Sequence, residues 1–278
     1  MKKFCYPFII LMLIFISPFS YGQNLKIMTY NIRLDIASDG ENAWPNRKDF
    51  LTSQIQFYNP DIFGVQEATP NQVTDIASEL PHYDKFGIGR DGKEKGEACT
   101  IYYDKNRFVV EQFNTFWLSK TPNVISKGWD AAYNRICTYG LFKDLKSKKV
   151  FWVFNTHLDH VGNEARSKGV ALILSKIKEV NTKKYPVIFM GDLNSEPHTE
   201  QILEIKNVMN DTREISKQKP FGPSGTFNGF KYNEPATLLI DYIFISKNSF
   251  KVLKHAVLSD AVNLKYPSDH LPIYIEIN

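Results

Sequence analysis

A run of apolar residues that ends in two polar side chains is the part of this 278-residue chain best suited to chemistry. The segment 186–190 (PVIFM) predicts a short buried strand that breaks at Gly191. Asp192 and Asn194 follow, and since side chains two apart in an extended backbone face the same side, we expect the carboxylate and the amide to converge. Together they could hold an attacking water and a phosphate oxygen. The alternative is an Asx-type turn in which both side chains only satisfy loop backbone.

Polar side chains also stand where the other predicted buried strands end or begin. These are Asn31, Glu67, His157, and the neighbours Asp269 and His270. Strand ends of layered sheets can meet at one rim, and polar residues repeated there indicate a site. Each residue alone has an ordinary explanation, such as a helix cap for Glu67, a turn for Asn31 or a satisfied core histidine for His157. Ordinary explanations for all of them at once are much less expected than one shared site.

Hydrophobic periodicity predicts the elements that would position these residues. We expect strands over 25–32, 61–66, 97–103, 108–113, 134–142, 149–156, 186–190, 239–246, 250–258 and 271–277, and helices over 46–58, 70–80, 163–182 and 200–205. The order of strands and helices occurs twice, before and after about residue 141. This repetition predicts one α/β domain of two similar halves, with sheets inside and helices outside.

The N-terminus has the features of an export signal. Lys2 and Lys3 precede an apolar run over 4–19, and Ser20-Tyr21-Gly22 supplies small residues for cleavage before Gln23. We therefore expect a signal peptide over 1–22, a single mature domain over 23–278, and a periplasmic or secreted location. The alternative is an uncleaved membrane anchor, for which the apolar run is rather short.

Composition is that of an ordinary globular protein, with 43% hydrophobic and 23% charged residues. Loss of Lys2 and Lys3 leaves a mature net charge near +2, which does not favour a dedicated nucleic-acid binder. Two mature cysteines, Cys99 and Cys137, are too few for a disulfide-built scaffold. No feature predicts a protein partner, so we expect a monomer.

Six short motifs occur in order along the mature chain: TYNIR (29–33), QE (66–67), NTHLDH (155–160), GDLN (191–194), IDYIF (240–244) and SDHLPI (268–273). This set resembles the endonuclease/exonuclease/phosphatase superfamily, and the segment 126–140 is most similar to a branch of bacterial secreted hydrolases. The resemblance implies a four-layer α-β-β-α sandwich of two halves packed sheet to sheet. It also implies cleavage of a phosphoester that depends on Mg²⁺ or Mn²⁺.

The resemblance assigns metal and water roles residue by residue. Glu67 and Asp269 match the metal carboxylates with Asn31 near them, which suits hard divalent cations because these prefer oxygen ligands. Asp192 and Asn194 match the residues that orient the nucleophilic water and the phosphate. We therefore expect in-line attack of water on phosphorus with the transition-state charge stabilised electrostatically.

The resemblance also assigns the histidines and the remaining phosphate-binding residues. His270 matches the histidine beside the scissile phosphate, with Asp241 as its carboxylate partner. His157 matches the second histidine, with Glu97 as the acid that would orient it and favour its protonated form. Arg135 falls where some members carry a phosphate-binding arginine, so Asn31, Glu97 and Arg135 are expected to contact substrate phosphate. The alternative for Glu97 and Arg135 is a surface ion pair.

Three functions remain open. We predict a nuclease-like phosphodiesterase, with nucleic acid, a phospholipid head group or a small phosphate as substrate. The alternatives are a phosphomonoesterase on a small or lipid-borne phosphate and a non-catalytic binding protein, and fold alone does not choose among them. Aromatic residues in the long segment 114–133, with Trp44 and 227–232, would build a closed pocket or simply pack.

A disulfide between Cys99 and Cys137 is a further hypothesis, conditional on export. Each cysteine lies two residues from a candidate site residue, Glu97 or Arg135, so on neighbouring strands all four side chains would share a face.

Overall fold

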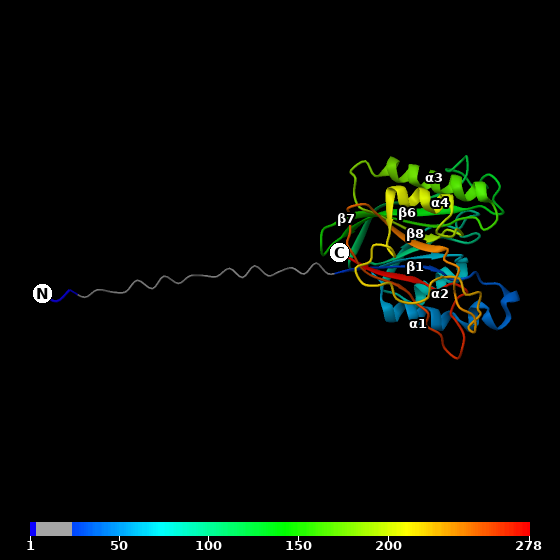
Figure 1. The fold of residues 1–278 in the computed structure, drawn as a ribbon, viewed down its shortest axis with the longest axis horizontal. Helices are drawn as coiled ribbons and strands as arrows, with labels where there is room; N and C mark the ends of the chain where they lie inside the picture. The colour runs from blue at the N-terminus through cyan, green and yellow to red at the C-terminus, as the bar shows by residue number, and fades with distance from the viewer. Residues whose placement is uncertain (4–23) are drawn as a thin grey trace.

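The computed structural model describes residues 1–3 and 24–278 (Figure 1). Most of the predicted signal peptide, residues 4–22, therefore lies outside the described residues. No helix within the described part of the chain has the length and apolar character needed to cross a membrane.

Two six-stranded sheets form the centre of the described chain. The first sheet has the order β11 (Val252–Val257), β12 (Ile273–Ile277), β1 (Leu25–Asn31), β2 (Ile62–Gln66), β4 (Ile101–Asp104) and β3 (Tyr83–Phe86). The second has the order β5 (Phe108–Trp117), β6 (Ile136–Asp144), β7 (Val150–His157), β8 (Val187–Asp192), β10 (Asp241–Ser246) and β9 (Met209–Asp211).

Helices cover the outer face of each sheet (Figure 1). The helices α1 (Lys48–Tyr58) and α2 (Pro70–Glu79) lie on the first sheet, preceded by the short 3₁₀ helices η1 (Ala37–Asn42) and η2 (Trp44–Asn46). On the second sheet lie α3 (Asn163–Val180) and α4 (Glu200–Val208). The predicted four-layer α-β-β-α sandwich is confirmed.

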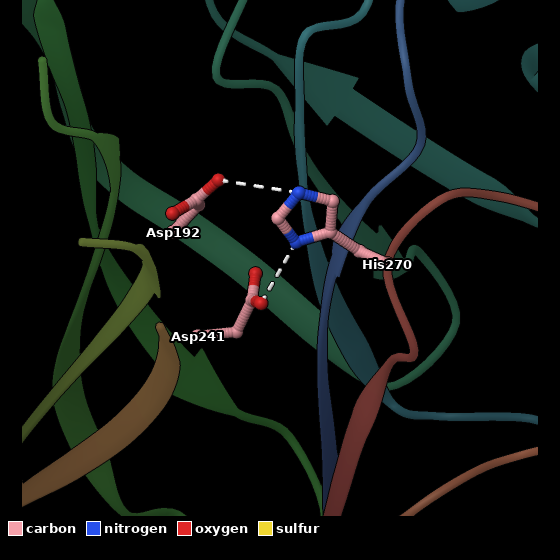
Figure 2. A group of neighbouring side chains, drawn as sticks. All are labelled: Asp192, Asp241 and His270. Atoms are coloured by element: carbon pink, nitrogen blue, oxygen red, sulfur yellow. Dashed lines mark hydrogen bonds and ion pairs between the residues drawn. The ribbon is translucent and has the colours of Figure 1, made fainter. Parts of the chain in front are cut away.

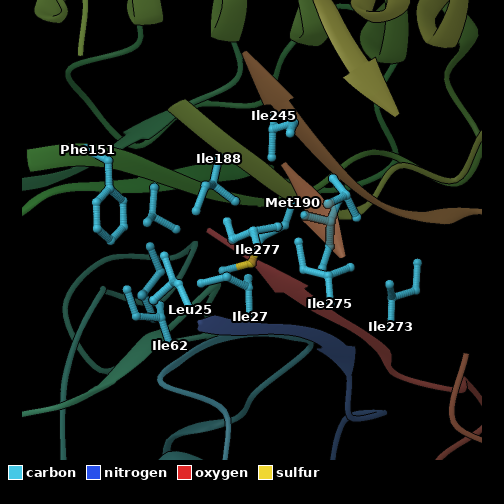
Figure 3. Close-up of a cluster of buried hydrophobic side chains, with 14 of the residues drawn as sticks. Leu25, Ile27, Ile62, Phe151, Ile188, Met190, Ile245, Ile273, Ile275 and Ile277 are labelled. Carbon is cyan, nitrogen blue, oxygen red and sulfur yellow. The ribbon is translucent and has the colours of Figure 1, made fainter. Parts of the chain in front are cut away.

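Branched apolar side chains fill the space between the sheets (Figure 3). Ile27 and Ile275 of the first sheet face the second, where Ile188 and Met190 are fully or almost fully buried. Strands covered on both faces are apolar at successive positions rather than at alternate ones, as in the run 187–190. Each such side chain contributes about 1.5–3 kcal/mol when it is buried.

The predicted division of the chain near residue 141 is wrong. Both β5 and β6 belong to the second sheet, so the change of sheet falls between β4 and β5. At the other end of the chain, β12 returns to pair antiparallel with β1, placing Leu25 opposite Ile277, and β11 pairs with β12. The two halves are thus similar layers, but the C-terminal strands complete the N-terminal sheet.

Several element boundaries also differ from the sequence predictions. The strand expected over 97–103 begins only at Ile101, because Ala98 makes isolated bridges to Ala68 and Gly89 instead of joining a ladder. Strand β5 extends to Trp117 through its pairing with β6, so the long aromatic loop begins after it. The short edge strands β3 and β9 were not predicted; β3 has only its two end residues buried.

Cys99 and Cys137 are both free and buried, so the disulfide hypothesis is not supported. Ile136 packs against Cys99 and Trp117 on one face of β6. Its neighbour Cys137 faces the opposite way, into the cluster beneath α3, because successive side chains of a strand alternate. The two thiols therefore lie in different apolar clusters.

A buried histidine makes the fold sensitive to acid. His255 on β11 is 3% exposed; its Nδ1 lies 3.1 Å from Thr212 Oγ1 and its Nε2 has no hydrogen-bond partner among the described residues. Burial lowers the pKa of His255 to about 3, with the Arg213 charge acting in the same direction. The folded state thus binds fewer protons than the unfolded state between about pH 6.5 and 3, and stability falls as pH falls through this window.

We predict that His255→Gln weakens the dependence of the unfolding free energy on pH. The wild type should lose about 2 kcal/mol of unfolding free energy from this residue between pH 7 and 5, whereas the variant should not, whatever its absolute stability. Urea unfolding at both pH values measures the difference. His198→Gln, at an exposed position, is the matched control; equal pH dependence in wild type and His255→Gln would contradict the prediction.

Candidate active site

The candidate residues converge because the parallel strands of both sheets end at one rim. Strands β7 and β8 run parallel and place His157 beside Asp192, while antiparallel β10 begins with Asp241 opposite Asp192. In the first sheet, parallel β1 and β2 end at Asn31 and Gln66, directly before Glu67. The rim surrounds a cavity of about 580 Å³ whose lining includes most of the predicted residues: Glu67, Glu97, Arg135, His157, Asp192, Asn194, Asp269 and His270.

A buried Asp–His–Asp group forms the centre of the site (Figure 2). His270 Nδ1 lies 2.9 Å from Asp241 Oδ2, which bears out the predicted pairing, and His270 Nε2 lies 3.7 Å from Asp192 Oδ2. All three residues are at most 4% exposed. Their ligand atoms lie within 4.8 Å of one another, so the group could also hold a metal ion. Because His270 Nδ1 is already hydrogen-bonded to Asp241, we interpret Asp192, His270 and Asp241 as a triad that binds protons rather than as a metal site.

Burial and mutual charge set the protonation states of this triad. Burial raises the pKa of Asp192 to about 7, with the Asp241 charge adding to the effect and His270 opposing it. For His270, burial disfavours the charged form, but the carboxylates of Asp241 and Asp192 outweigh it and hold the pKa well above its ordinary value. The triad therefore holds a protonated imidazole and a carboxyl group that exchanges its proton near neutral pH.

His157 is the opposite case and corrects one prediction. Burial, with the charges of Arg135 and His270, holds the pKa of His157 well below its ordinary value, so the ring is neutral. Its Nε2 accepts a hydrogen bond from Asn194 Nδ2 at 3.0 Å and lies 3.4 Å from Asp192 Oδ2. The acid predicted to orient it is engaged elsewhere, because the Glu97 carboxylate forms an ion pair with Arg90 at 2.8 Å.

Two further carboxylates, one directly after β2 and one shortly before β12, also line the cavity. Glu67 Oε1 accepts a hydrogen bond from Asn31 Nδ2, and its Oε2 accepts one from the backbone N–H of Leu34. Asp269 is 8% exposed, and its Oδ2 lies 3.9 Å from an Nη of Arg33. Burial raises the pKa of Asp269; His270 opposes this effect and the like charge of Glu67 adds to it. Two repelling carboxylates that line one cavity are suited to a shared cation.

Asn31 connects the two groups of acids. Its Nδ2 donates to Glu67 and, at 2.9 Å, to Asp192 Oδ2 of the second sheet. Its Oδ1 accepts the backbone N–H of Arg33 through one of its two lone pairs. The predicted position beside the metal carboxylates is correct, and the direct ligand role of Asn31 stays a prediction.

A layer of buried amides lies directly under the rim. Gln66 Nε2 donates to Asn155 Oδ1 at 2.7 Å, and Asn155 Nδ2 donates to the backbone oxygens of Val65 and Thr100. Gln66 belongs to the first sheet and Asn155 to the second. Buried amides with satisfied hydrogen bonds fix one relative position of the two layers.

Local backbone geometry also supports the rim. Arg33, Glu67 and Asn194 all have a positive φ, between 45° and 62°, which is uncommon for residues other than glycine and is concentrated at functional sites. Gly191 has a φ of 144°, and a Cβ there would lie 2.0 Å from the backbone oxygen of Thr156. Glycine is therefore required at the position where β8 turns Asp192 into the cavity.

Arg135 faces the cavity from a network that the sequence did not predict. Its Nε lies 3.2 Å from Asp159 Oδ2, and an Nη lies 3.0 Å from His160 Nδ1. The ring of Tyr133 stacks on His160 with centroids 5.9 Å apart, and the Arg90 guanidinium lies 4.7 Å from the Tyr133 centroid. We call Arg90, Tyr133 and His160 the stacked wall of the cavity.

Arg33 and His160 belong to the motifs TYNIR and NTHLDH, and Tyr133 belongs to the aromatic segment 114–133, so all three had a usable signal, whereas Arg90 had none. Of the predicted pocket aromatics, Tyr133 and Phe227 line the cavity. Trp44 instead is 1% exposed and donates to Asp75, so it belongs to the core of the first half.

Comparison with known proteins decides the family. The model of the Endonuclease/Exonuclease/phosphatase family matches residues 28–270. The chain belongs to this family. Its members are phosphoester hydrolases, so we conclude that the chain is an enzyme. The acids and histidines described above form its active site.

Relatives with different names share this fold. A solved mannosyl-6-phosphatase from Bacteroides thetaiotaomicron is 36% identical, with a TM-score of 0.87 over 91% of this chain and 99% of that one. An uncharacterized protein of Acanthamoeba polyphaga mimivirus is 31% identical over 55% of this chain. The CCR4-Not 3′-5′-exoribonuclease subunit Ccr4 of Mycosarcoma maydis is 23% identical over 92% of this chain. The chain spans only 60% and 50% of the length of the last two proteins.

We predict that Asp241→Asn lowers kcat by about 10²–10⁴-fold without unfolding the protein. Without the Asp241 charge, burial would dominate and the pKa of His270 would fall. Activity that needs the protonated ring would then be lost at a lower pH than in the wild type. A pH–rate profile and a thermal melt measure both effects.

Asp211→Asn is the matched control, because Asp211 on β9 is also buried and does not line the cavity. A wild-type pH profile in Asp241→Asn would show that His270 does not act through Asp241.

Proposed function

We propose that this enzyme is a divalent-metal-dependent phosphomonoesterase that acts on a small phosphorylated sugar. The observation that carries the proposal is the cavity itself: about 580 Å³ is the volume of a site for one small ligand, and acids, histidines and arginines line it together. The 36% identity to a mannosyl-6-phosphatase over nearly the whole of that chain supports the same substrate class.

The donor set fits a hard divalent cation. Glu67 and Asp269 present carboxylate oxygens to one cavity, and their repulsion would be relieved by a cation between them. Mg²⁺ is commonly bound through one or two carboxylates and keeps several waters, so two acids are enough. When bound, the ion would supply positive charge to the phosphate oxygens and to the leaving oxygen. Mg²⁺ or Mn²⁺ therefore remains our expected cofactor.

The residues of the second sheet would carry the proton chemistry. The carboxyl of Asp192, whose pKa lies at about 7, would accept a proton from the attacking water. The new bond forms between water oxygen and phosphorus, and the bond from phosphorus to the sugar oxygen breaks in line with it. Protonated His270 would donate to a phosphate oxygen and stabilise the charge that develops there. Neutral His157, which accepts a hydrogen bond from Asn194, would act as a positioning residue beside Asp192.

Arg33 and Arg135 would bind the phosphate, and the stacked wall would contact the sugar that leaves. Both guanidiniums line the cavity, where planar donors match phosphate oxygens. Tyr133 is 52% exposed, which leaves ring surface for contact with a sugar face. The diester cleavage expected from the sequence is the competing function, and likeness to an exoribonuclease subunit is its support. The same assay separates the two.

The test is hydrolysis of mannose 6-phosphate, p-nitrophenyl phosphate, bis-p-nitrophenyl phosphate, RNA, plasmid DNA and sphingomyelin in the presence of Mg²⁺. We expect phosphate release from the monoesters, abolished by EDTA and reduced by about 10²–10⁴-fold in Asp192→Ala and His270→Ala. Turnover of a diester without turnover of any monoester would reverse the assignment. No turnover by folded protein on any substrate would favour the binding-protein alternative.

We predict that Tyr133→Ala raises KM for the sugar phosphate by about 2- to 10-fold with kcat little changed, because an aromatic contact of this kind adds about 0.5–1.5 kcal/mol to binding. Tyr133→Phe should restore the wild-type value. Steady-state kinetics on mannose 6-phosphate measures both. Tyr232→Ala, at an exposed ring that does not line the cavity, is the control; an unchanged KM in Tyr133→Ala would remove the sugar-contact role.

We also propose that the protein is exported, on the strength of the N-terminal sequence over 1–22, and that it acts as a monomer.

A further inference from the structure

The end of the sandwich opposite the active-site rim is strongly basic. Strands β5, β7, β8 and β11 begin there, and β6 and β10 end there, as the pairing of Phe108 with Asp144 and of Ile245 with Ile188 requires. Both sheets reach this end, because Asn278 and Lys149 line one small cavity. We define the basic pole by the exposed lysines of its loops: Lys105, Lys146, Lys148, Lys149, Lys183, Lys184, Lys247 and Lys251.

The loops of the basic pole carry a local excess of positive charge. The loops 105–107, 145–149, 181–186 and 247–251 contain no acidic residue. Of the nearby acids, Asp61 and Asp144 form ion pairs with buried Arg107 at 2.7 and 3.0 Å. Asp104 directly precedes Lys105, and Glu204 lines a cavity with Lys184 and Lys247. The mature chain has a net charge of only about +2, so the pole concentrates charge that the rest of the surface lacks.

Apolar surface lies among these lysines. A second cavity of about 610 Å³ opens between α3, α4 and the start of β8, and Ile177 and Val208 line it together with Lys184, Lys247 and Glu204. Val208 is 45% exposed. In the loop between β6 and β7, Leu145 is 39% exposed and is followed directly by Lys146. Apolar groups surrounded by lysines match a surface of anionic head groups above acyl chains.

The chain itself enters the domain at this end. Leu25, the first residue of β1, pairs with Ile277 and lines the same small cavity as Lys149. Residues 1–22, whose sequence is largely apolar, precede it. Any attachment of that segment to a membrane would hold the basic pole against the lipid.

We propose that the basic pole is a docking surface for an anionic phospholipid bilayer. Strand β8 crosses the domain from Val187 near the pole to Asp192 in the active site, a rise of about 16 Å. The catalytic cavity therefore faces away from the bilayer and remains open to soluble substrate. A nucleic acid would also match the lysines, but it would be held far from the cavity and would leave the apolar surface unused.

The test uses the chain from Gln23, since the whole sandwich is formed by residues 24–278 and a solved relative of matching extent has the same fold. Its partitioning onto vesicles of phosphatidylcholine is compared with partitioning onto equal parts of phosphatidylcholine and phosphatidylglycerol. We expect binding only to the anionic vesicles, weakened by salt. The variant Lys148→Glu/Lys184→Glu/Lys247→Glu should bind at least about tenfold more weakly.

The control variant Lys93→Glu/Lys120→Glu/Lys168→Glu carries the same charge change at exposed lysines away from the pole and should bind nearly as the wild type. Equal loss in both variants, or no preference of the wild type for anionic vesicles, would overturn the proposal. Binding of single-stranded DNA, but not of vesicles, that is lost only in the pole variant would assign the pole to nucleic acid instead. If the triple pole variant melts early, its three single substitutions replace it, each with a loss of about fivefold.

Discussion

The catalytic arrangement depends on one amide that joins the two sheets. Asn31 donates one hydrogen bond to Glu67 of the first sheet and another to Asp192 of the second, both near 3.0 Å. Directly beneath it, Gln66 and Asn155 make a second buried connection. Neither sheet contains a complete site: the first supplies the paired carboxylates, and the second supplies the triad's two aspartates and His157. The site exists because buried polar groups fix how one sheet lies on the other.

The electrostatics of the rim follow from the same enclosure. Two histidines lie within reach of one carboxylate, yet their protonation states differ, because His270 has two acids around it while His157 has an arginine and a second imidazolium nearby. Burial strengthens each of these charge interactions. The arrangement thus separates a proton donor from a neutral positioning ring within one small cavity, and it leaves Asp192 able to change its state near neutral pH.

Local sequence predicted the elements and most of the site, but not its long-range connections. The apolar run before Asp192 and the motif order identified the strand ends, and the pairing of Asp241 with His270 was correct. The sheet boundary was not predictable from repetition, because β12 returns to pair with β1 across almost the whole chain. The sequence analysis paired Glu97 with His157, whereas in the structure Glu97 forms an ion pair with Arg90. Arg90 lies in a loop, where hydrophobic periodicity gives no prediction.

The layered arrangement of the site has an evolutionary consequence. The apolar side chains between the sheets also help to set the distance between the carboxylates and the triad, and Ile27 and Met190 among them do not line the cavity. A drift in the size of these side chains would slide one half of the reaction centre relative to the other by fractions of an ångström. Relatives could therefore diverge in substrate and rate while keeping every acid and histidine, through mutations that conventional inspection of the pocket would pass over.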